Sequence, residues 1–256
     1  MHYLLDTKTP MITAMLQADN PDRVLELMER AKAGGADALG MQFCRMKSEH
    51  QTKEVYSRLI KSASTYPTYV TNYRQGYNEK KTDDELAAEL LMLAECGATF
   101  CDVMGDMFDI QPDQMATDES AISKQMALIK DIHERGSKVI MSSHVCKFIP
   151  IERIVRIANE QVRRGADVVK IVVGAENSEE EIENLRAIEL LGRTLPVPFL
   201  ILSSGKCDIL RRIGGRYGCA MYLCVVEHDE LSTRAQPLLG HIKSLENIFS
   251  SIDAVK

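Results

Sequence analysis

Two residues of this sequence have side chains whose types and spacing could support covalent chemistry, Lys170 and His144. Lys170 lies in the run 165–174, Gly-Ala-Asp-Val-Val-Lys-Ile-Val-Val-Gly, whose β-branched residues predict a parallel strand buried on both faces. Lysine is rarely buried without a partner or a task, and burial lowers the pKa of its ammonium group. The neutral amine can attack a carbonyl carbon and form a Schiff base. The alternative is a lysine near a strand end that extends to water or pairs with a carboxylate.

His144 follows the apolar run 138–142, which predicts the strand that precedes the Lys170 strand in the chain. Neighbouring strands lie about 4.8 Å apart, so the carboxyl ends of these two strands would bring His144 and Lys170 into one pocket. An imidazole transfers protons near neutral pH. The pair therefore predicts imine chemistry assisted by an acid–base group.

Further polar residues are predicted at the same end of the strands: Arg74, Arg212, Ser232 and Gln236. Two arginines without a matching surplus of acidic residues indicate an anionic substrate, with a carboxylate bound by a planar guanidinium. For Arg212 the alternative is a solvated charge on a helix, beside Arg211.

A repeated unit of helix, glycine and short apolar run positions these residues. The predicted strands are 10–16, 38–42, 68–73, 99–103, 138–142, 165–174, 198–202 and 219–225. The predicted helices are 21–33, 49–63, 83–95, 119–134, 151–163, 178–190, 207–213 and 234–248. Eight alternating pairs, with no Gly-x-Gly-x-x-Gly after the first strand, predict an α/β fold of the (β/α)₈ TIM barrel type that forms one domain over residues 1–256.

Composition limits the classes of partner. The 256 residues are 45% hydrophobic and 27% charged with a net charge of -6, and no basic cluster is longer than Arg211-Arg212. These values argue against nucleic acid and anionic membrane as partners, and favour a small molecule and further copies of the chain. The N-terminus lacks the pattern of a signal peptide, and no apolar run approaches the roughly 18 residues of a membrane span, so we expect a cytoplasmic protein.

The cysteines predict neither a disulfide framework nor a metal site. Their number, seven, is odd, and no two of them form a Cys-x-x-Cys pair. We expect reduced, mostly buried thiols and no bound metal.

The segments that carry these residues resemble the type I 3-dehydroquinate dehydratase family. Val-Ile-Met-Ser-Ser-His at 139–144 resembles the family's motif that ends in the catalytic histidine, and 165–173 resembles its Schiff-base strand, 26 residues further on. Arg212 falls where the family has a carboxylate-binding arginine, and Arg74 matches the arginine that ends its third strand. Leu-Ser-Thr-Arg-Ala-Gln-Pro at 231–237, which contains Ser232 and Gln236, matches the family's closing loop over the substrate.

The resemblance implies a lyase that needs no cofactor and converts 3-dehydroquinate to 3-dehydroshikimate, in the shikimate pathway or in quinate catabolism. Lys170 would form an imine with the ketone, and His144 would remove the adjacent proton and later protonate the leaving hydroxyl. For an enzyme of this kind we also expect a homodimer.

Several positions depart from the family pattern. The second strand of the family ends in Glu-x-Arg, whereas this chain has Gly-Met-Gln at 40–42, and the nearest arginine is Arg45. Four residues after Arg74 the family has a glutamate that holds the histidine and the substrate; here Asn78 has that spacing, and Glu79 follows it. Gln42, Asn78 and Glu79 are therefore further candidates for contact with the substrate.

These departures leave two other functions open. A class I aldolase or another imine-forming lyase would retain the lysine chemistry on a different keto acid. A non-catalytic barrel would only bind a small carboxylate. Borohydride reduction separates imine chemistry from simple binding, because only an imine gives a covalent adduct.

Overall fold

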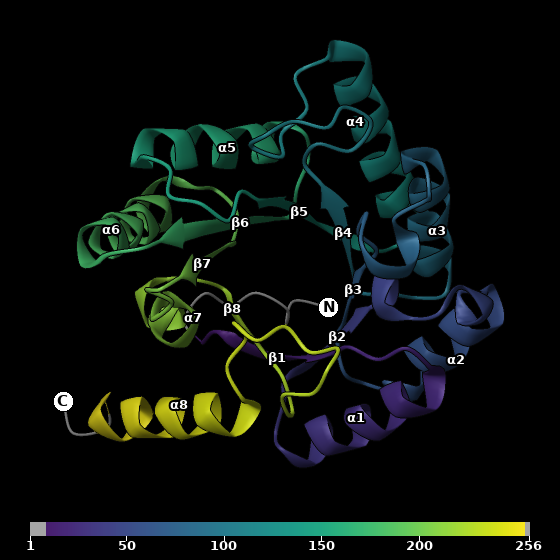
Figure 1. Cartoon of the computed structure of the whole chain (residues 1–256), viewed down its shortest axis with the longest axis horizontal. Helices are drawn as coiled ribbons and strands as arrows, with labels where there is room; N and C mark the ends of the chain where they lie inside the picture. Colours follow the sequence, from purple (N-terminus) through teal and green to yellow (C-terminus); the bar gives the residue numbers. More distant parts are fainter. Residues whose placement is uncertain (1–8, 254–256) are drawn as a thin grey trace.

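The structure is a computed structural model that describes residues 9–253. Eight strands alternate with eight α-helices, and the helices surround the strands (Figure 1). The strands are β1 Met11–Leu16, β2 Ala38–Gln42, β3 Thr68–Thr71, β4 Phe100–Met104, β5 Lys138–His144, β6 Val168–Ala175, β7 Phe199–Gly205 and β8 Met221–Cys224. The helices are α1 Pro21–Ala33, α2 Lys53–Ser62, α3 Asp83–Glu95, α4 Glu119–Glu134, α5 Ile151–Arg163, α6 Ser178–Thr194, α7 Leu210–Ile213 and α8 Leu239–Asp253.

The strands form one parallel sheet in the order β7-β6-β5-β4-β3-β2-β1-β8. Where the two edge strands begin, the backbone N–H of Ala220 donates to the carbonyl of Phe199 at 2.8 Å, although β7 and β8 share no ladder in the described chain. The sheet therefore curls into a nearly closed barrel, which confirms the predicted fold. Within residues 9–253 no helix is both long and apolar enough to cross a membrane.

Local signals in the sequence account for the ends of the helices. The side chain of Asn20 accepts the N–H of Arg23 at 2.9 Å, and Pro21 occupies the first position of α1. Gly35, just after α1, has φ +77°, a conformation that favours glycine. The chain then turns directly into β2.

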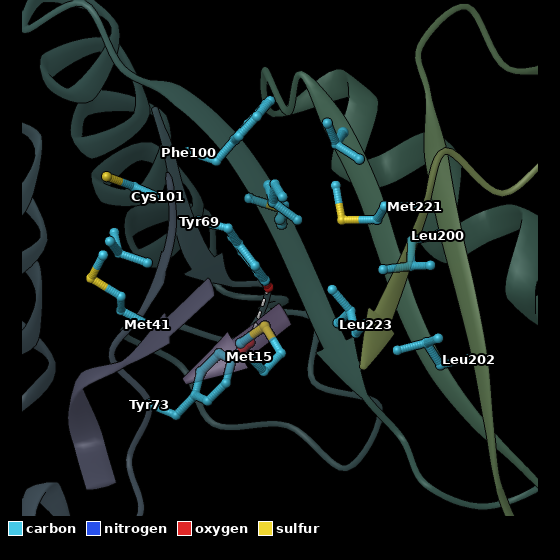
Figure 2. Packing of buried hydrophobic residues seen from close by; sticks show 14 of the residues in the cluster. Met15, Met41, Tyr69, Tyr73, Phe100, Cys101, Leu200, Leu202, Met221 and Leu223 are labelled. Atoms are coloured by element: carbon cyan, nitrogen blue, oxygen red, sulfur yellow. Dashed lines mark hydrogen bonds between the residues drawn. The ribbon is translucent and has the colours of Figure 1, made fainter. Parts of the chain in front are cut away.

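Burial on both faces explains the composition of the strands. Every residue of β2, β3, β4, β6 and β8 is buried, because helices cover the outside while side chains fill the inside. Figure 2 shows part of this packing, in which Tyr69, Phe100, Leu200 and Met221 come from four different strands.

The last helix begins later than predicted, at Leu239 instead of residue 234. Pro237 disfavours helical backbone at the residue before it, and its carbonyl accepts the N–H of Val225 at 2.9 Å. The segment before Leu239 therefore lies as a loop across the end of the barrel. The second helix also begins later than predicted, at Lys53 instead of residue 49, because the side chain of Thr52 accepts the N–H of Val55 and caps α2 there.

The close packing of β6 leads to a stability prediction. A Cβ on Gly174 would lie 2.7 Å from the backbone Cα of Lys147, so we expect Gly174→Ala to lower the free energy of unfolding by about 1–3 kcal/mol. A Cβ on Gly240, in α8, meets nothing within 4 Å, and Gly240→Ala should raise stability by about 0.5–1 kcal/mol. Urea denaturation followed by circular dichroism measures both effects, and equal effects would contradict this packing.

Candidate active site

A cavity of about 380 Å³ opens at the carboxyl ends of the strands. It is lined by Met15, Gln42, Arg45, Thr71, Tyr73, Arg74, Gln75, Met104, Gln114, His144, Cys146, Lys170, Val172, Leu202, Arg211, Leu223, Thr233 and Gln236. No aspartate or glutamate belongs to this lining, whereas four of its members are arginine or lysine. The cavity therefore favours an anionic ligand.

Lys170 belongs to the lining of this cavity and is 3% exposed. Its Nζ donates to the hydroxyls of Tyr69 at 2.8 Å and Tyr73 at 2.7 Å, and lies 3.2 Å from Oδ2 of Asp102. Both hydroxyls donate in turn to the same carboxylate oxygen of Asp102. Figure 2 shows the two tyrosine side chains pointing toward one another. Ser142 donates to the other carboxylate oxygen of Asp102.

Burial and pairing act in opposite directions on this cluster. Burial lowers the pKa of Lys170, and the nearby charge of Asp102 offsets part of that effect. Burial alone would raise the pKa of Asp102, but the charge of Lys170 and the hydrogen bonds from Ser142 and Tyr69 hold it below its ordinary value. Burial, and then the charge of Asp102, raise the pKa values of Tyr69 and Tyr73 well above the ordinary range, so both hydroxyls keep their protons.

His144 lies one pleat further along the barrel than Lys170. Ser142 is paired with Lys170 and His144 with Val172, so both functional side chains face the cavity from adjacent strands. The imidazole packs edge-on against the Tyr73 ring, with 4.9 Å between centroids, and makes no hydrogen bond within the described chain. Burial, and then the charge of Lys170, lower the pKa of His144 to about 3. The ring is therefore neutral at neutral pH and can act as a base.

Arg211, and not Arg212, lies in the cavity. The Arg211 side chain is 6% exposed, its Nε donates to the carbonyl of Ser203, and no carboxylate in the described chain forms a salt bridge with it. Arg212 is 40% exposed and is paired with Asp208 at 2.7 Å, which is the solvated arrangement considered as an alternative for this residue.

Arg74 lines the cavity, but two carboxylates already neutralise it. Its Nε donates to Asp83 at 2.7 Å, and one of its Nη atoms donates to Asp106 at 2.8 Å. Asp106 is 1% exposed, so this ion pair is largely removed from water. The free positive charge of the cavity therefore comes from residues other than Arg74.

The family model for type I 3-dehydroquinase matches residues 12–253. The chain belongs to the type I 3-dehydroquinase family. This is a family of lyases, and membership confirms the resemblance seen in the strands of His144 and Lys170.

Curated relatives in this family are 3-dehydroquinate dehydratases. One from Alkaliphilus oremlandii is 34% identical over 91 residues, which are 35% of this chain and 36% of the relative. One from Klebsiella pneumoniae is 29% identical over 148 residues, which are 57% of this chain and 56% of the relative. The alignments thus span less than two thirds of these relatives.

Solved structures of type I 3-dehydroquinase members share the fold. The type I 3-dehydroquinate dehydratase of Clostridium difficile has a TM-score of 0.80 at 18% identity, over 95% of this chain and 93% of that chain. The 3-dehydroquinate dehydratase of Geobacillus kaustophilus has a TM-score of 0.80 at 17% identity, over 94% and 91%. The barrel is therefore retained at low identity.

The positions where this chain departs from the type I 3-dehydroquinase pattern differ in whether they line the cavity. Gln42 lines the cavity and accepts from the amide of Gln17 at 2.6 Å. Asn78 is buried outside the cavity lining and donates to Asn72 at 2.6 Å, while Glu79 is exposed. Of the three further candidates, only Gln42 is placed to contact a ligand.

The loop before α8 contributes Thr233 and Gln236 to the cavity. Gln17 holds this loop, because its side-chain oxygen accepts the backbone N–H of Thr233 at 2.6 Å. Gln236 is 7% exposed, and its buried Oε1 has no partner in the described chain. Ser232 lies outside the cavity lining and bonds to the backbone of Asp229 at the turn.

Sequence reasoning missed Tyr69, Tyr73 and Asp102 as partners of Lys170. The sequence did contain a signal for Asp102. A carboxylate inside the apolar run Phe100–Met104 needs a buried partner, just as a lysine inside β6 does. The tyrosines carried no such signal, because aromatic residues are common in the cores of strands.

The described residues form no group of three histidine, cysteine, aspartate or glutamate side chains placed to hold a metal ion. All seven cysteines are free, and Cys146 is the exposed one at the cavity.

The electrostatics of Lys170 lead to a pH prediction. Because the charge of Asp102 raises the pKa of Lys170 against the effect of burial, Asp102→Asn should lower that pKa further. The rate at which glyoxylate and borohydride modify Lys170, measured by peptide mass, should then rise to its plateau at a lower pH than in the wild type. Ser142→Ala, which leaves the Asp102 charge in place, is the control. A midpoint shifted to higher pH in Asp102→Asn would contradict the pairing.

Proposed function

We propose that this protein dehydrates 3-dehydroquinate to 3-dehydroshikimate through an imine at Lys170. The observation that carries the proposal is the buried amine of Lys170 beside a neutral His144 in an anion-favouring cavity. Membership in the type I 3-dehydroquinase family, whose curated relatives here are 3-dehydroquinate dehydratases, supports the choice of substrate.

The first stage joins Lys170 to the substrate. The neutral amine attacks the ketone carbon, the C–N bond forms, and loss of water leaves a protonated imine. Because burial lowers the pKa of Lys170, more of the amine is neutral near pH 7 than in a solvated lysine.

The second stage removes the hydroxyl. His144 takes a proton from the carbon next to the imine carbon, and the C–H electron pair moves toward the imine nitrogen. That pair then returns, the C–O bond to the neighbouring hydroxyl breaks, and His144 gives its proton to the departing oxygen. Hydrolysis of the imine releases the product and restores the amine of Lys170.

Arg211 is the proposed partner of the substrate carboxylate. It is a buried guanidinium in the cavity without a carboxylate of its own, so binding an anion supplies the missing counter-charge. Gln236 and Thr233 would then contact the rest of the substrate from the closing loop, together with Gln42 from β2. Because Asp83 and Asp106 already neutralise the charge of Arg74, we expect this residue to contribute less than Arg211 to the binding of an anion.

One observation favours a different keto acid as the substrate of the same imine chemistry. Arg45 lines the cavity, and its buried Nε has no partner in the described chain. With Arg211, the cavity thus holds two guanidinium groups without carboxylate partners, which suits a ligand with two anionic groups. An aldolase or another imine-forming lyase acting on such a dianion is the second candidate.

A cytoplasmic location and a homodimer remain predictions from the sequence. Light scattering of the purified protein measures its mass in solution and tests the dimer.

Turnover tests the roles of the two reactive residues. The wild type should convert 3-dehydroquinate to an enoate product that absorbs in the ultraviolet, and Lys170→Ala should abolish this activity. His144→Ala should lower kcat by about 10²–10⁴, the usual contribution of a positioned acid–base group. Unchanged turnover in Lys170→Ala would rule out the proposed imine.

Adjacent arginines provide a matched test of carboxylate binding. Arg211→Gln should lower kcat/KM for 3-dehydroquinate by about 10- to 100-fold, because it removes a buried charged hydrogen-bond donor worth roughly 1.5–3 kcal/mol. Arg212→Gln removes only an exposed ion pair, and kcat/KM should stay within about two-fold of the wild type. Steady-state kinetics on both variants measure the difference, and a larger loss in Arg212→Gln would return the role to that residue.

A further inference from the structure

Tyr73 contacts both Lys170 and His144, and it also lines the cavity. Its hydroxyl lies 2.7 Å from Nζ of Lys170 and 2.6 Å from Oδ2 of Asp102, and its ring packs edge-on against His144. Tyr69 makes the same two hydrogen bonds but does not line the cavity. A ligand carbonyl held at Lys170 would therefore meet the hydroxyl of Tyr73 and not that of Tyr69.

Formation of an imine needs a proton donor at the carbonyl oxygen, first when the amine attacks and again when water leaves. His144 is neutral at neutral pH, with a pKa of about 3, so before it has removed a proton from substrate there is no imidazolium to act as a general acid, and the remaining N–H is only a very weak acid. Asp102 is 1% exposed, accepts hydrogen bonds from the hydroxyls of Tyr69 and Tyr73, and is not part of the cavity lining. A donor that touches both Lys170 and the cavity is thus required, and Tyr73 meets both conditions.

We propose that Tyr73 is the catalytic acid and base of imine formation, and that it passes protons between the substrate oxygen and the Lys170–Asp102 pair. The proposal rests on the imine chemistry of the proposed function and holds for any carbonyl substrate of this site. It also gives a role to a tyrosine that sequence reasoning did not single out.

Proton transfers among Lys170, Asp102 and Tyr73 accompany the formation of the imine. The Lys170 ammonium gives one proton to Asp102, which leaves a neutral amine beside a neutral carboxyl. As the amine attacks, the C–N bond forms, the C=O π pair moves to oxygen, and that oxygen takes the Tyr73 proton; the phenolate then takes the surplus proton from nitrogen. Tyr73 next protonates the carbinolamine hydroxyl, water leaves, and the nitrogen lone pair forms the C=N bond.

The last transfer restores the starting charges. The Tyr73 phenolate takes back the proton that Asp102 holds, through the 2.6 Å hydrogen bond between them. An ammonium beside a carboxylate has then become a protonated imine beside a carboxylate, with one water released. Because burial and the Asp102 charge hold the pKa of Tyr73 high, the phenolate is short-lived and the hydroxyl is ready for another cycle.

The test compares Tyr73→Phe with Tyr69→Phe, which removes a hydroxyl that makes the same bonds to Lys170 and Asp102. Glyoxylate is the carbonyl probe, borohydride traps the imine, and peptide mass gives the rate of modification at Lys170 on the pH plateau of each protein. We expect Tyr73→Phe to slow the modification by about 100-fold and Tyr69→Phe by less than about five-fold. The wild-type rate should show a solvent deuterium isotope effect that Tyr73→Phe changes.

Equal losses in the two variants, or a fast Tyr73→Phe reaction, would overturn the role of Tyr73. Thermal unfolding of both variants shows whether the loss of a hydroxyl has disturbed the fold to the same extent. Turnover of 3-dehydroquinate is measured separately: no turnover together with a Tyr73-dependent glyoxylate reaction would reject the substrate and keep this inference. A wild type in which glyoxylate gives no adduct at Lys170 would overturn both.

Discussion

The interior of the barrel depends on one buried ion pair, Lys170 with Asp102. Removing an ammonium and a carboxylate from water costs several kcal/mol per ion unless each finds partners, and here two tyrosine hydroxyls and Ser142 complete the set. Tyr73 follows β3, and the other members of the set lie in β3, β4, β5 and β6, so the registers of these strands must agree. A slip of one residue in β6 would turn Lys170 toward the helices and leave Asp102 buried alone.

The positive charges at the cavity are of two kinds, those paired with a carboxylate of the protein and those without such a partner in the described chain. Asp102 neutralises the charge of Lys170 inside the protein. Asp83 and Asp106 neutralise that of Arg74. Arg211 and Arg45 have no such carboxylates in the described chain and face the cavity. The lysine is therefore set for chemistry at a carbonyl, while the unpaired guanidinium groups select an anionic molecule that carries it.

The sequence was informative where side-chain period and burial determine position. Lys170 was recognised because a charged residue within an aliphatic strand of a parallel barrel is buried whichever face it is on. His144 was recognised because it ends the neighbouring strand, at the face where such barrels place their active sites. Arg212 was wrongly expected to line the cavity. Each step along a helix turns the side chain by about 100°, and the sequence of the four-residue helix α7 does not determine which of its two arginines points inward. Arg211, the neighbour of Arg212, faces inward instead. Tyr73 could not be recognised, since its role depends on the distances to Lys170 and Asp102 that only tertiary structure supplies.

The most direct measurement of the central claim is to map where 3-dehydroquinate becomes attached when borohydride is added to the wild-type protein. The account predicts one added substrate-derived mass on the peptide that contains Lys170, and none when substrate is omitted. Turnover without any adduct, or an adduct on a different lysine, would contradict it and move the chemistry away from the buried Lys170–Asp102 pair.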